Sequence, residues 1–386
     1  MSREKERLRI LITDPHLFGG GQITYVCKLS QGLIKRGHEV VVGCKKGSVF
    51  VELSKTYGYK VIDEFFFKGG LRIISWLRDI SKFKEILKDL NPDIIHVNGS
   101  QDHWTAAIVN SLLNHKYCIV RTRHNTYKVS NHFLNKWLNI NATDYHIAVC
   151  EFVMVNLIEN NGFPREIITA IHNGVDVEEF RANEELRKKA REEFGFTPDD
   201  IVFGISARLN PAKGHKFLIQ AVKKISSFVP NIKVLILGQG ILEEELKQLT
   251  KDLKLEDVIK FGGYRKDMAY CTQAFDVAVM PSIDCDTSSF SLKEAMAEGK
   301  PVIASDYGGL PEIITDGVEG IIVPAGTVEP LAEAIKTLAT NPELRKKMGE
   351  RAFQRATSNF SSEQFVDKTI KTYLHALKIH YAHSTH

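Results

Sequence analysis

The chain of 386 residues is longer than a single hydrophobic core usually supports, which indicates two domains. Its 43% hydrophobic and 25% charged residues are ordinary for a globular protein, and no apolar run reaches the roughly 20 residues that span a bilayer. The net charge of +4 is small and no nucleic-acid-binding signature accompanies it, so no nucleic-acid partner is expected. The charged start, MSREKERLRI, lacks the apolar core of a secretory signal, and export is not expected either.

Short apolar strands alternate with amphipathic helices along the chain. In the first half we predict a helix at 22–35 and strands at 9–14, 39–44, 93–97, 118–123 and 145–150. In the second half we predict strands at 201–207, 232–238, 258–263, 276–282, 301–305 and 320–324. This alternation is typical of parallel sheets with helices on both faces, so the expected fold class is α/β with two doubly wound domains.

The alternation of strands and helices begins again after a charged segment at 177–194. We predict this segment to be helical and to contribute little to either core. We place the boundary between the domains at 180/181, giving an N-terminal domain of residues 1–180 and a C-terminal domain of residues 181–362. A long amphipathic helix over about 363–386 is expected to pack back on the N-terminal domain. If the two domains face each other, ligands bind in the cleft between them, at the carboxyl ends of the strands.

The first strand runs into DPHLFGGGQ, where Gly20 and Gly21 enter a helix. Glycines at a helix start let backbone amides approach a phosphate or a sugar, although a flexible turn is the alternative. The spacing does not form G-x-G-x-x-G, which disfavours a nicotinamide-dependent enzyme. His124 follows the strand CIVRTR and can hydrogen-bond a sugar hydroxyl or a phosphate, with His96 and His103 as rivals. We interpret His96 as structural because it ends an apolar run.

Two cations follow the first strand of the C-terminal domain. Arg208 comes directly after that strand, and Lys213 in LNPAKG leads into the next helix. A departing nucleoside diphosphate gains negative charge, which fixed cations at this edge of the sheet would stabilise. The alternative is two solvated surface cations, and their position favours the functional interpretation.

The segment IDCDTSSFSLKEAMAEGKPV combines a polar loop with a helix start. Loop amides there can hold a diphosphate, Glu294 in the first helical turn can bind ribose hydroxyls, and Asp286 can face the sugar. A carboxylate that only stabilises the helix dipole is the alternative for Glu294. The residues Asp284, Cys285 and Asp286 spell D-x-D, but two aspartates alone make a poor metal site, so no metal ion is expected.

Together these segments resemble the retaining GT-B glycosyltransferases of family 4 over nearly the whole chain. The resemblance rests on the order and spacing of GG at 20–21, RGHEV, DIIH at 93–96, TRHNT, HNGVD at 172–176, ARLNPAKG, ILGQG at 237–240, EAMAEGKPVIAS and GGLPEI at 308–313. It implies two Rossmann-like domains, with the acceptor side in the first and the nucleotide-sugar site in the second.

The resemblance also implies roles for single residues. It assigns contacts with the donor phosphate to Gly20, Gly21, Arg208 and Lys213, and contact with the transferred sugar to His124. It assigns ribose binding to Glu294 and further donor contacts to the loop residues Ser289, Phe290, Ser291 and Leu292. The positions near the base are Tyr264 and Arg265. Asp286 stands where the family has a glutamate, and the serine-rich TSSFS replaces the glycine of the motif. The shorter Asp286 side chain reaches less far toward the donor sugar than a glutamate would.

The implied activity is transfer of a sugar from a nucleotide diphosphate-sugar to an acceptor hydroxyl, with retention of configuration and without metal or other cofactor. The acceptor would be a sugar or a lipid-linked molecule in glycan, glycolipid or lipopolysaccharide synthesis. A sugar-nucleotide epimerase of the same fold, and a non-catalytic nucleotide-sugar binder, remain alternatives. A glycogen-type phosphorylase would need a much longer chain.

Two features bear on location. The six cysteines show no C-x-x-C pair and most lie in apolar runs, which indicates reduced thiols and a cytoplasmic protein. The segment 65–88 mixes aromatic, aliphatic and basic residues, as a surface that touches an anionic membrane would. An ordinary packed helix with solvated lysines explains that segment equally well, so contact with the inner face of the membrane stays an alternative.

Overall fold

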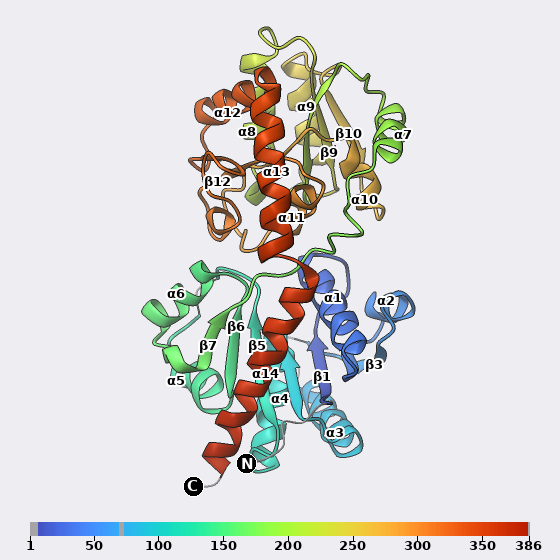
Figure 1. The fold of residues 1–386 in the computed structure, drawn as a ribbon. Coiled ribbons are helices and arrows are strands. Elements are labelled where there is room, and N and C mark those ends of the chain that lie inside the picture. Colours follow the sequence, from blue (N-terminus) through green and yellow to red (C-terminus); the bar gives the residue numbers. More distant parts are fainter. Residues whose placement is uncertain (1–6, 69–72, 128, 385–386) are drawn as a thin grey trace. The chain divides into compact units, whose positions relative to one another are not determined.

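The computed structural model describes residues 7–68, 73–127 and 129–384, which form two compact units (Figure 1). The N-terminal domain comprises the described residues up to Gly174 and those from Ser362 onward, and the C-terminal domain is Val175–Ser361. The first crossing between the units therefore lies a few residues before the boundary expected at 180/181. Where the chain crosses, Val175 N–H donates to the carbonyl of Phe360 at 2.8 Å. Residues 1–6 and 69–72, on which the expectations for the N-terminus and for segment 65–88 partly rest, lie outside the described residues.

The N-terminal domain is built on a parallel sheet that has seven strands in the described part of the chain, in the order β3-β2-β1-β4-β5-β6-β7. Its strands are β1 (Arg9–Asp14), β2 (Glu39–Lys45), β3 (Lys60–Phe65), β4 (Ile94–Val97), β5 (Cys118–Arg123), β6 (Tyr145–Ala148) and β7 (Ile168–Ala170). Its helices are α1 (Gly21–Lys35), α2 (Phe50–Tyr57), α3 (Ile73–Leu90), α4 (Ser100–Leu112), α5 (Phe133–Lys136), α6 (Glu151–Asn161) and α14 (Ser362–Ser384), and a π-helical turn (Trp137–Asn141) follows α5.

Helices cover both faces of this sheet. On one face, α3 and α4 pack on the strands through a cluster that includes Leu11, Phe83, Ile95 and Val109. On the other face, α14 packs against α1 and β5, and the rings of Tyr25 and Phe365 meet with their centroids 5.0 Å apart. The last helix of the chain is therefore part of the N-terminal domain (Figure 1).

The C-terminal domain repeats the plan with a parallel sheet that has six strands in its described residues, in the order β10-β9-β8-β11-β12-β13. Its strands are β8 (Ile201–Ser206), β9 (Ile232–Leu237), β10 (Ile259–Gly263), β11 (Val277–Met280), β12 (Val302–Ser305) and β13 (Gly320–Val323). Its helices are α7 (Glu184–Phe194), α8 (His215–Ile225), α9 (Glu243–Asp252), α10 (Met268–Cys271), α11 (Phe290–Ala297), α12 (Glu329–Thr340) and α13 (Pro342–Asn359).

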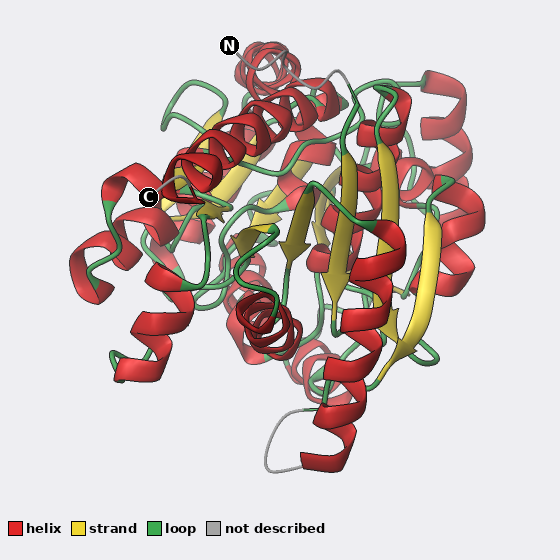
Figure 2. Cartoon of the chain, turned by 90° about the horizontal axis from the view of Figure 1, so that it is seen from below, coloured by secondary structure: helices red, strands yellow, loops and turns green. Residues whose placement is uncertain are grey.

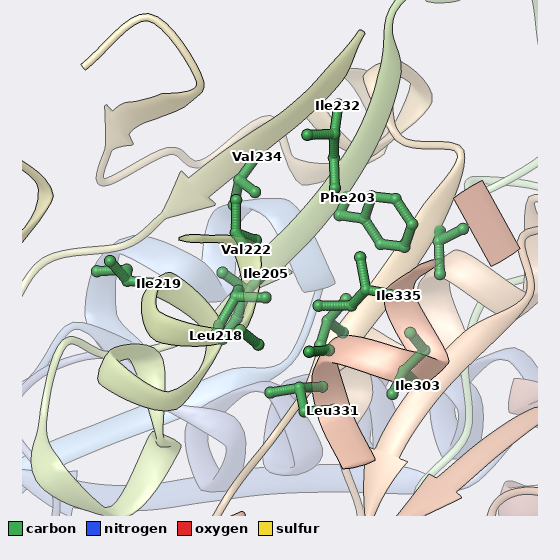
Figure 3. Close-up of a cluster of buried hydrophobic side chains, with 14 of the residues drawn as sticks. Phe203, Ile205, Leu218, Ile219, Val222, Ile232, Val234, Ile303, Leu331 and Ile335 are labelled. Carbon is green, nitrogen blue, oxygen red and sulfur yellow. The ribbon is translucent and has the colours of Figure 1, made fainter. Parts of the chain in front are cut away.

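Alternate residues of the central strands enter different cores, because successive side chains of a strand point to opposite faces. Phe203 and Ile205 of β8 pack with α8 and α12 in one cluster, which Figure 3 shows in close-up. Val202 of the same strand belongs to a second cluster, with residues of α7 and α11. Figure 2 shows the resulting arrangement, with red helices on both sides of the yellow strands.

The expectation that the charged segment 177–194 contributes little to either core is wrong. Phe180, Ala190 and Phe194 are buried in the second cluster of the C-terminal domain. The charged residues of the segment did not indicate a buried face, because one of them is itself part of that face. Arg191 is buried and donates to the carboxylate of Asp276 at 2.7 Å and to backbone carbonyls. A paired arginine can enter a core that a solvated one cannot.

The expected strands all form, within one or two residues at their ends, and β3 and β7 were not predicted. Both lie at the edges of their sheet, where a strand is short or carries polar residues and gives a weak pattern. Among the described residues, no helix has both the length and the apolarity needed to cross a bilayer.

Candidate functional site

In each sheet the strand order reverses between two neighbouring strands, β1 and β4 in the N-terminal domain and β8 and β11 in the C-terminal domain. Beyond the carboxyl ends of such a pair the connections diverge to opposite sides and leave a crevice, where ligands of doubly wound domains bind. Most of the predicted site residues follow these strands or their direct neighbours, and Tyr264 and Arg265 follow the edge strand β10.

In the C-terminal domain, Arg208 follows β8 and is exposed, and Lys213 ends a short 3-10 turn (Pro211–Lys213) just before α8. Gly214 fixes this turn with φ at +71°, a conformation that L side chains rarely adopt. A Cβ atom there would lie 2.0 Å from the carbonyl oxygen of Pro281, which follows β11. The turn that carries Lys213 is therefore pressed against the end of the neighbouring strand.

Lys213 and Asp286 form an ion pair, which the sequence did not predict. The Lys213 ammonium donates to Asp286 Oδ2 at 2.8 Å, and the Ser282 hydroxyl donates to the same oxygen at 2.7 Å. The carboxylate side chain is 6% exposed and that of the lysine 20% exposed. Two of the predicted site residues are thus held together beyond the carboxyl ends of β8 and β11.

The backbone around Asp286 is fixed by the GGLPEI segment. Gly308 has φ at +60°, and a Cβ atom there would lie 2.1 Å from the carbonyl oxygen of Asp286. Asp284, the other aspartate of D-x-D, is exposed and accepts a hydrogen bond from the Tyr307 hydroxyl at 2.8 Å, which lowers the pKa of its carboxyl. Each aspartate of the D-x-D sequence therefore already has a protein partner. Among the described residues, no group of three or more His, Cys, Asp or Glu side chains is arranged to hold a metal ion.

The serine-rich loop ends at α11, which begins at Phe290 with Ser289 as its N-cap. The Ser289 hydroxyl accepts a hydrogen bond from the amide of Leu292 at 3.4 Å and lies 3.1 Å from the hydroxyl of Ser291. Leu292 is 1% exposed and packs in the core, so a donor contact at this position would have to come from its backbone.

The expectation that Glu294 lies in the first turn of the helix is wrong. It is the fifth residue of α11 and lies in the second turn, and the first turn holds no acidic residue. The helix starts earlier than expected, at Phe290 and not after Ser291, because Ser289, which satisfies an amide of the first turn, is the capping residue. Since the helix dipole acts mainly within the first turn, the dipole alternative for Glu294 is weakened. Glu294 is buried.

Lys293 was missed by the sequence analysis. Its side chain is fully buried, its ammonium donates to the Ser288 hydroxyl at 2.6 Å, and it lies 4.9 Å from the centre of the Phe360 ring. A buried lysine needs such partners, because an uncompensated buried charge is costly. It connects the loop to the end of α13. In the sequence, the signal for a buried Lys293 was its place within an apolar stretch of a helix that belongs mainly to the core.

The two residues expected near the base follow β10. Tyr264 is 58% exposed. The Arg265 guanidinium donates to both carboxylate oxygens of Asp267, at 2.6 and 2.8 Å, and to Glu193. Arg265 is therefore held by two carboxylates of this domain.

In the N-terminal domain, His124 follows β5 and is bound to Asn98, which follows β4. The distance from His124 Nε2 to Asn98 Oδ1 is 2.8 Å, and the Asn98 amide donates to the carbonyl of Thr13 at 3.2 Å. That second bond fixes the amide orientation, so the oxygen faces His124 and Nε2 carries the proton. Burial lowers the pKa of His124 well below its usual value, and nearby Arg121 adds to the effect. The imidazole is neutral, with Nδ1 as its acceptor atom.

The residues around His124 form one hydrogen-bonded group across the ends of β1, β4 and β5. Asp102 Oδ2 accepts bonds from the Thr13 hydroxyl at 2.8 Å and from the amides of Asn98 and Gly99 at 3.0 and 3.1 Å. The rings of Tyr25 and His124 meet edge-on, 4.7 Å apart. The sequence analysis missed Asn98 and Asp102, although both follow a predicted strand that ends in a polar loop.

The glycine segment lies at the same edge of the sheet. Gly20 and Gly21 are exposed at the start of α1. The next residue, Gln22, donates to Asp14 Oδ2 at 2.6 Å and to the Asn98 carbonyl at 3.1 Å. This contact fixes the start of α1 relative to the ends of β1 and β4.

The rival histidines are buried and bound inside the domain. His96 lies between the Tyr373 hydroxyl and the Thr122 hydroxyl, each 2.6 Å from one ring nitrogen. His103 Nε2 lies 2.7 Å from the Thr143 hydroxyl. These contacts agree with a structural role for both.

All six cysteines are free thiols, and Cys285 alone is not buried.

Comparison with known proteins places both domains in glycosyltransferase families. Residues 19–179 match the family described as Glycosyltransferase Family 4, and residues 186–355 match Glycosyl transferases group 1. A D-inositol 3-phosphate glycosyltransferase of Streptomyces bingchenggensis is 31% identical over 62% of this chain, which spans about half (54%) of that relative. The N-acetyl-alpha-D-glucosaminyl L-malate synthase of Bacillus anthracis is 27% identical over 77% of this chain and 78% of its own length.

Solved structures show the same fold over the whole chain. A glycosyltransferase from Rickettsia africae superimposes with a TM-score of 0.87 at 23% identity, covering 97% of this chain and all of its own. Anabaena Alr3699/HepE in complex with UDP-glucose gives 0.81 at 22% identity, covering 95% and 99%. By sequence, the N-terminal domain therefore belongs to Glycosyltransferase Family 4 and the C-terminal domain to Glycosyl transferases group 1, and the fold is that of the GT-B glycosyltransferases.

Proposed function

We propose that this protein transfers a sugar from a nucleotide diphosphate-sugar to an acceptor hydroxyl, with retention of configuration and without a metal ion. The C-terminal domain would bind the donor, and the N-terminal domain would supply the acceptor side. The observation that carries the proposal is the group at the ends of β8 and β11. There Lys213 is paired with Asp286, with Arg208 on the same connection after β8 and the N-terminus of α11 after β11.

This group suits a diphosphate leaving group. As the bond between the sugar and the phosphate breaks, negative charge grows on the phosphate oxygens. The cations of Arg208 and Lys213, with amides at the start of α11, stabilise that charge without having to reorganise. Asp286 and Ser282 hold the Lys213 ammonium in place before the donor arrives.

Retention follows if the acceptor hydroxyl attacks from the face that the diphosphate leaves. The departing phosphate then takes the acceptor proton, and no enzyme nucleophile is required. His124 would accept a hydrogen bond from a sugar hydroxyl at Nδ1, because Asn98 keeps the proton on Nε2. Its neutral state avoids placing a full positive charge beside the cationic, oxocarbenium-like sugar of the transition state.

Independence from metal is supported by the partners of the D-x-D residues. A divalent ion in this position would have to displace the Lys213 ammonium from Asp286 and the Tyr307 hydroxyl from Asp284. Fixed cations already supply the charge that the metal would contribute.

A thermal-shift panel of UDP, GDP, ADP and their sugars tests the donor site, since a ligand of the native state raises the melting temperature. We expect one base to stabilise the protein as the diphosphate and as the nucleotide-sugar. The expected stabilisation disappears in Arg208→Ala and remains in Lys347→Gln, a matched change of an exposed cation on α13. The absence of any stabilising nucleotide would contradict the proposal, and binding of donor without turnover would favour the non-catalytic alternative.

A further inference from the structure

The N-terminal domain contains an apolar hollow of about 750 Å³, within the range of small-ligand pockets. It lies where α3, α4 and α5 meet, and the side chains that form its apolar wall are Trp76, Trp104, Ile108, Phe133, Leu134 and Trp137. The sequence has only three tryptophans, and all three line this hollow. The rings of Trp104 and Trp137 are stacked, with centroids 6.1 Å apart.

Large apolar side chains continue from the hollow onto the surface. On α3, Ile73, Ile74 and Leu77 are 59%, 72% and 58% exposed on either side of Trp76. On α5, Phe133 and Leu134 are 69% and 46% exposed. Single exposed apolar residues are common, but a cluster around an apolar pocket marks a binding surface.

The charges at the rim are suited to an anion. Lys68 lines the hollow, and Lys136 is exposed between the lining residues Leu134 and Trp137. Asp79, a carboxylate that also lines the hollow, is 2% exposed, and its two oxygens accept the amides of Phe66 and Phe67 at 2.8 Å each. An apolar interior with an exposed basic rim fits an anionic amphiphile, with its chain inside and its head group outside.

The hollow also leads toward the predicted acceptor site. Gln101, in the first turn of α4, lines it, and α4 begins directly after Asn98 and Gly99. Asn98 is the partner of His124. The hollow therefore extends along α4 from the edge of the sheet at which the transferred sugar is expected.

We propose that this hollow binds the hydrocarbon chain of an anionic lipid that serves as the acceptor. Lys68 and Lys136 attract the anionic head group, and a hydroxyl of the head group is presented on the side of His124. The inference rests on the proposed glycosyl transfer and adds the class of acceptor to it.

Tryptophan fluorescence tests the inference directly, because the three tryptophans all report from the hollow. The probes are dihexanoyl phosphatidylglycerol below its critical micelle concentration, dihexanoyl phosphatidylcholine, and glycerol 3-phosphate. We expect a saturable blue shift with the anionic lipid, at least roughly tenfold weaker binding of the phosphatidylcholine, and no shift with the chainless phosphate. Absence of a shift with the anionic lipid, or equal binding of both lipids, would overturn the inference.

Variants separate the chain site from the rim. Ile108→Gln places a polar group in the wall and should weaken binding of both lipids by roughly tenfold, whereas Phe228→Gln, an exposed apolar residue of the C-terminal domain, should not. Lys136→Gln should reduce the preference for the anionic lipid, with Lys347→Gln as its control. If Ile108→Gln binds lipid normally while its fluorescence still shifts, the hollow is not the site.

The nucleotide panel distinguishes this inference from the proposed function. Stabilisation by a nucleoside diphosphate should be the same in Ile108→Gln and in the unchanged protein. If nucleotide binding persists and no lipid binds, the proposed transfer stands and the lipid acceptor is wrong. If lipid binds and sugar is transferred only to soluble acceptors, the acceptor role is also wrong.

Discussion

The Lys213 ammonium and the Asp286 carboxylate form a single unit, because each is the charged partner of the other at 2.8 Å. A carboxylate with 6% exposure would be unfavourable without this partner, and Ser282 supplies one further bond. A change at either residue therefore alters the other. The glutamate of the family motif would be one methylene longer, and Asp286 in its place can still act by aiming Lys213.

The two cations of the donor site should have larger effects on turnover than on folding. Arg208→Ala and Lys213→Ala each remove a charge that stabilises the departing diphosphate, and we expect kcat to fall by roughly 10²–10³. Steady-state kinetics with the donor identified by thermal shift, together with melting temperatures, check this. Arg208 is exposed, so its variant should melt normally. Near-normal turnover in a folded variant would show that the cation belongs only to the surface.

Asp286 and Glu294 should have different roles. Asp286→Asn should impair transfer more than binding of the bare diphosphate, and Glu294→Gln should weaken the nucleotide itself, each by about 1.5–3 kcal/mol. Because Asp286 also holds Lys213, the double variant Lys213→Ala/Asp286→Asn should lose less than the sum of the single losses. Calorimetric titration with diphosphate and with full donor measures both effects. Equal weakening of both ligands by both variants, or strict additivity of the double variant, would contradict this division.

At the scale of the elements, the turn before α8 determines where Lys213 lies. Its geometry depends on Gly214, whose missing side chain lets the turn approach the carbonyl of Pro281. The amide of Ile283 donates to the carbonyl of Ala212 at 2.8 Å and connects the same two segments. The connections after β8 and β11 therefore form one rigid unit.

Gly214→Ala tests this unit against Gly195→Ala. Both glycines have positive φ, +71° and +78°, so both variants carry the backbone strain of about 1–2 kcal/mol. Only at Gly214 would the new Cβ meet another atom, since nothing lies within 4 Å at Gly195. We expect Gly214→Ala to lower the melting temperature further than Gly195→Ala and to weaken diphosphate binding. Equal melting temperatures with unchanged binding would show that the turn does not position Lys213.

The strands other than the edge strands β3 and β7 could be predicted from the sequence because buried parallel strands are continuous apolar runs. The same pattern located Arg208, Lys213 and His124, which follow such runs directly. It could not reveal partners that lie far apart in sequence, such as Lys213 with Asp286 or His124 with Asn98. The sequence also could not identify Ser289 as the residue that caps α11, because three adjacent serine or threonine residues could each cap the helix. The cap at Ser289 places Glu294 in the second turn.

At the scale of the whole molecule, buried histidines distinguish the two domains. In the N-terminal domain, burial lowers the pKa of His96 and His146 to about 3 and that of His103 and His124 well below the usual value. In the C-terminal domain, burial lowers the pKa of His215 to about 4. These histidines stay neutral in the folded protein and take up protons on unfolding below pH about 6.5, so the stability that they confer is lost as pH falls.

Other groups have the opposite effect on how stability depends on pH. Burial raises the pKa of Glu298, so this carboxyl favours the folded C-terminal domain at lower pH and offsets His215. Burial also raises the pKa of Asp79 and Asp102 in the N-terminal domain, which offsets part of the histidine effect there. The hydrogen bond to Asp14 raises the pKa of His16, and burial of His380 is outweighed by the hydrogen bond to Asp144 and its charge, which raise the pKa of that ring, so these two histidines also favour the folded N-terminal domain at lower pH. The four buried histidines have the larger shifts, and below pH 6.5 they leave the N-terminal domain more sensitive to acid than the C-terminal domain.

We therefore expect the N-terminal domain to lose stability first between pH 7 and pH 5. Each buried histidine contributes a slope of up to about 1.4 kcal/mol per pH unit. Thermal melting at several pH values, followed by tryptophan fluorescence for the N-terminal domain and by far-ultraviolet circular dichroism for both, checks this. The fluorescence midpoint should fall more than the midpoint of the later circular dichroism transition. A fluorescence midpoint that is unchanged between pH 7 and pH 5 would contradict the assignment.

Metal-independent transfer with retention can be followed in a single NMR experiment. The protein is incubated in EDTA with the α-linked nucleotide-sugar selected by thermal shift, and proton spectra follow the anomeric signals, with water as the acceptor if no other is supplied. We expect release of the nucleoside diphosphate and first appearance of the α-configured product, at a rate that Lys213→Ala reduces roughly 10²–10³-fold. A β-configured first product, or turnover that appears only when Mg²⁺ or Mn²⁺ is added, would show that the proposed mechanism is wrong.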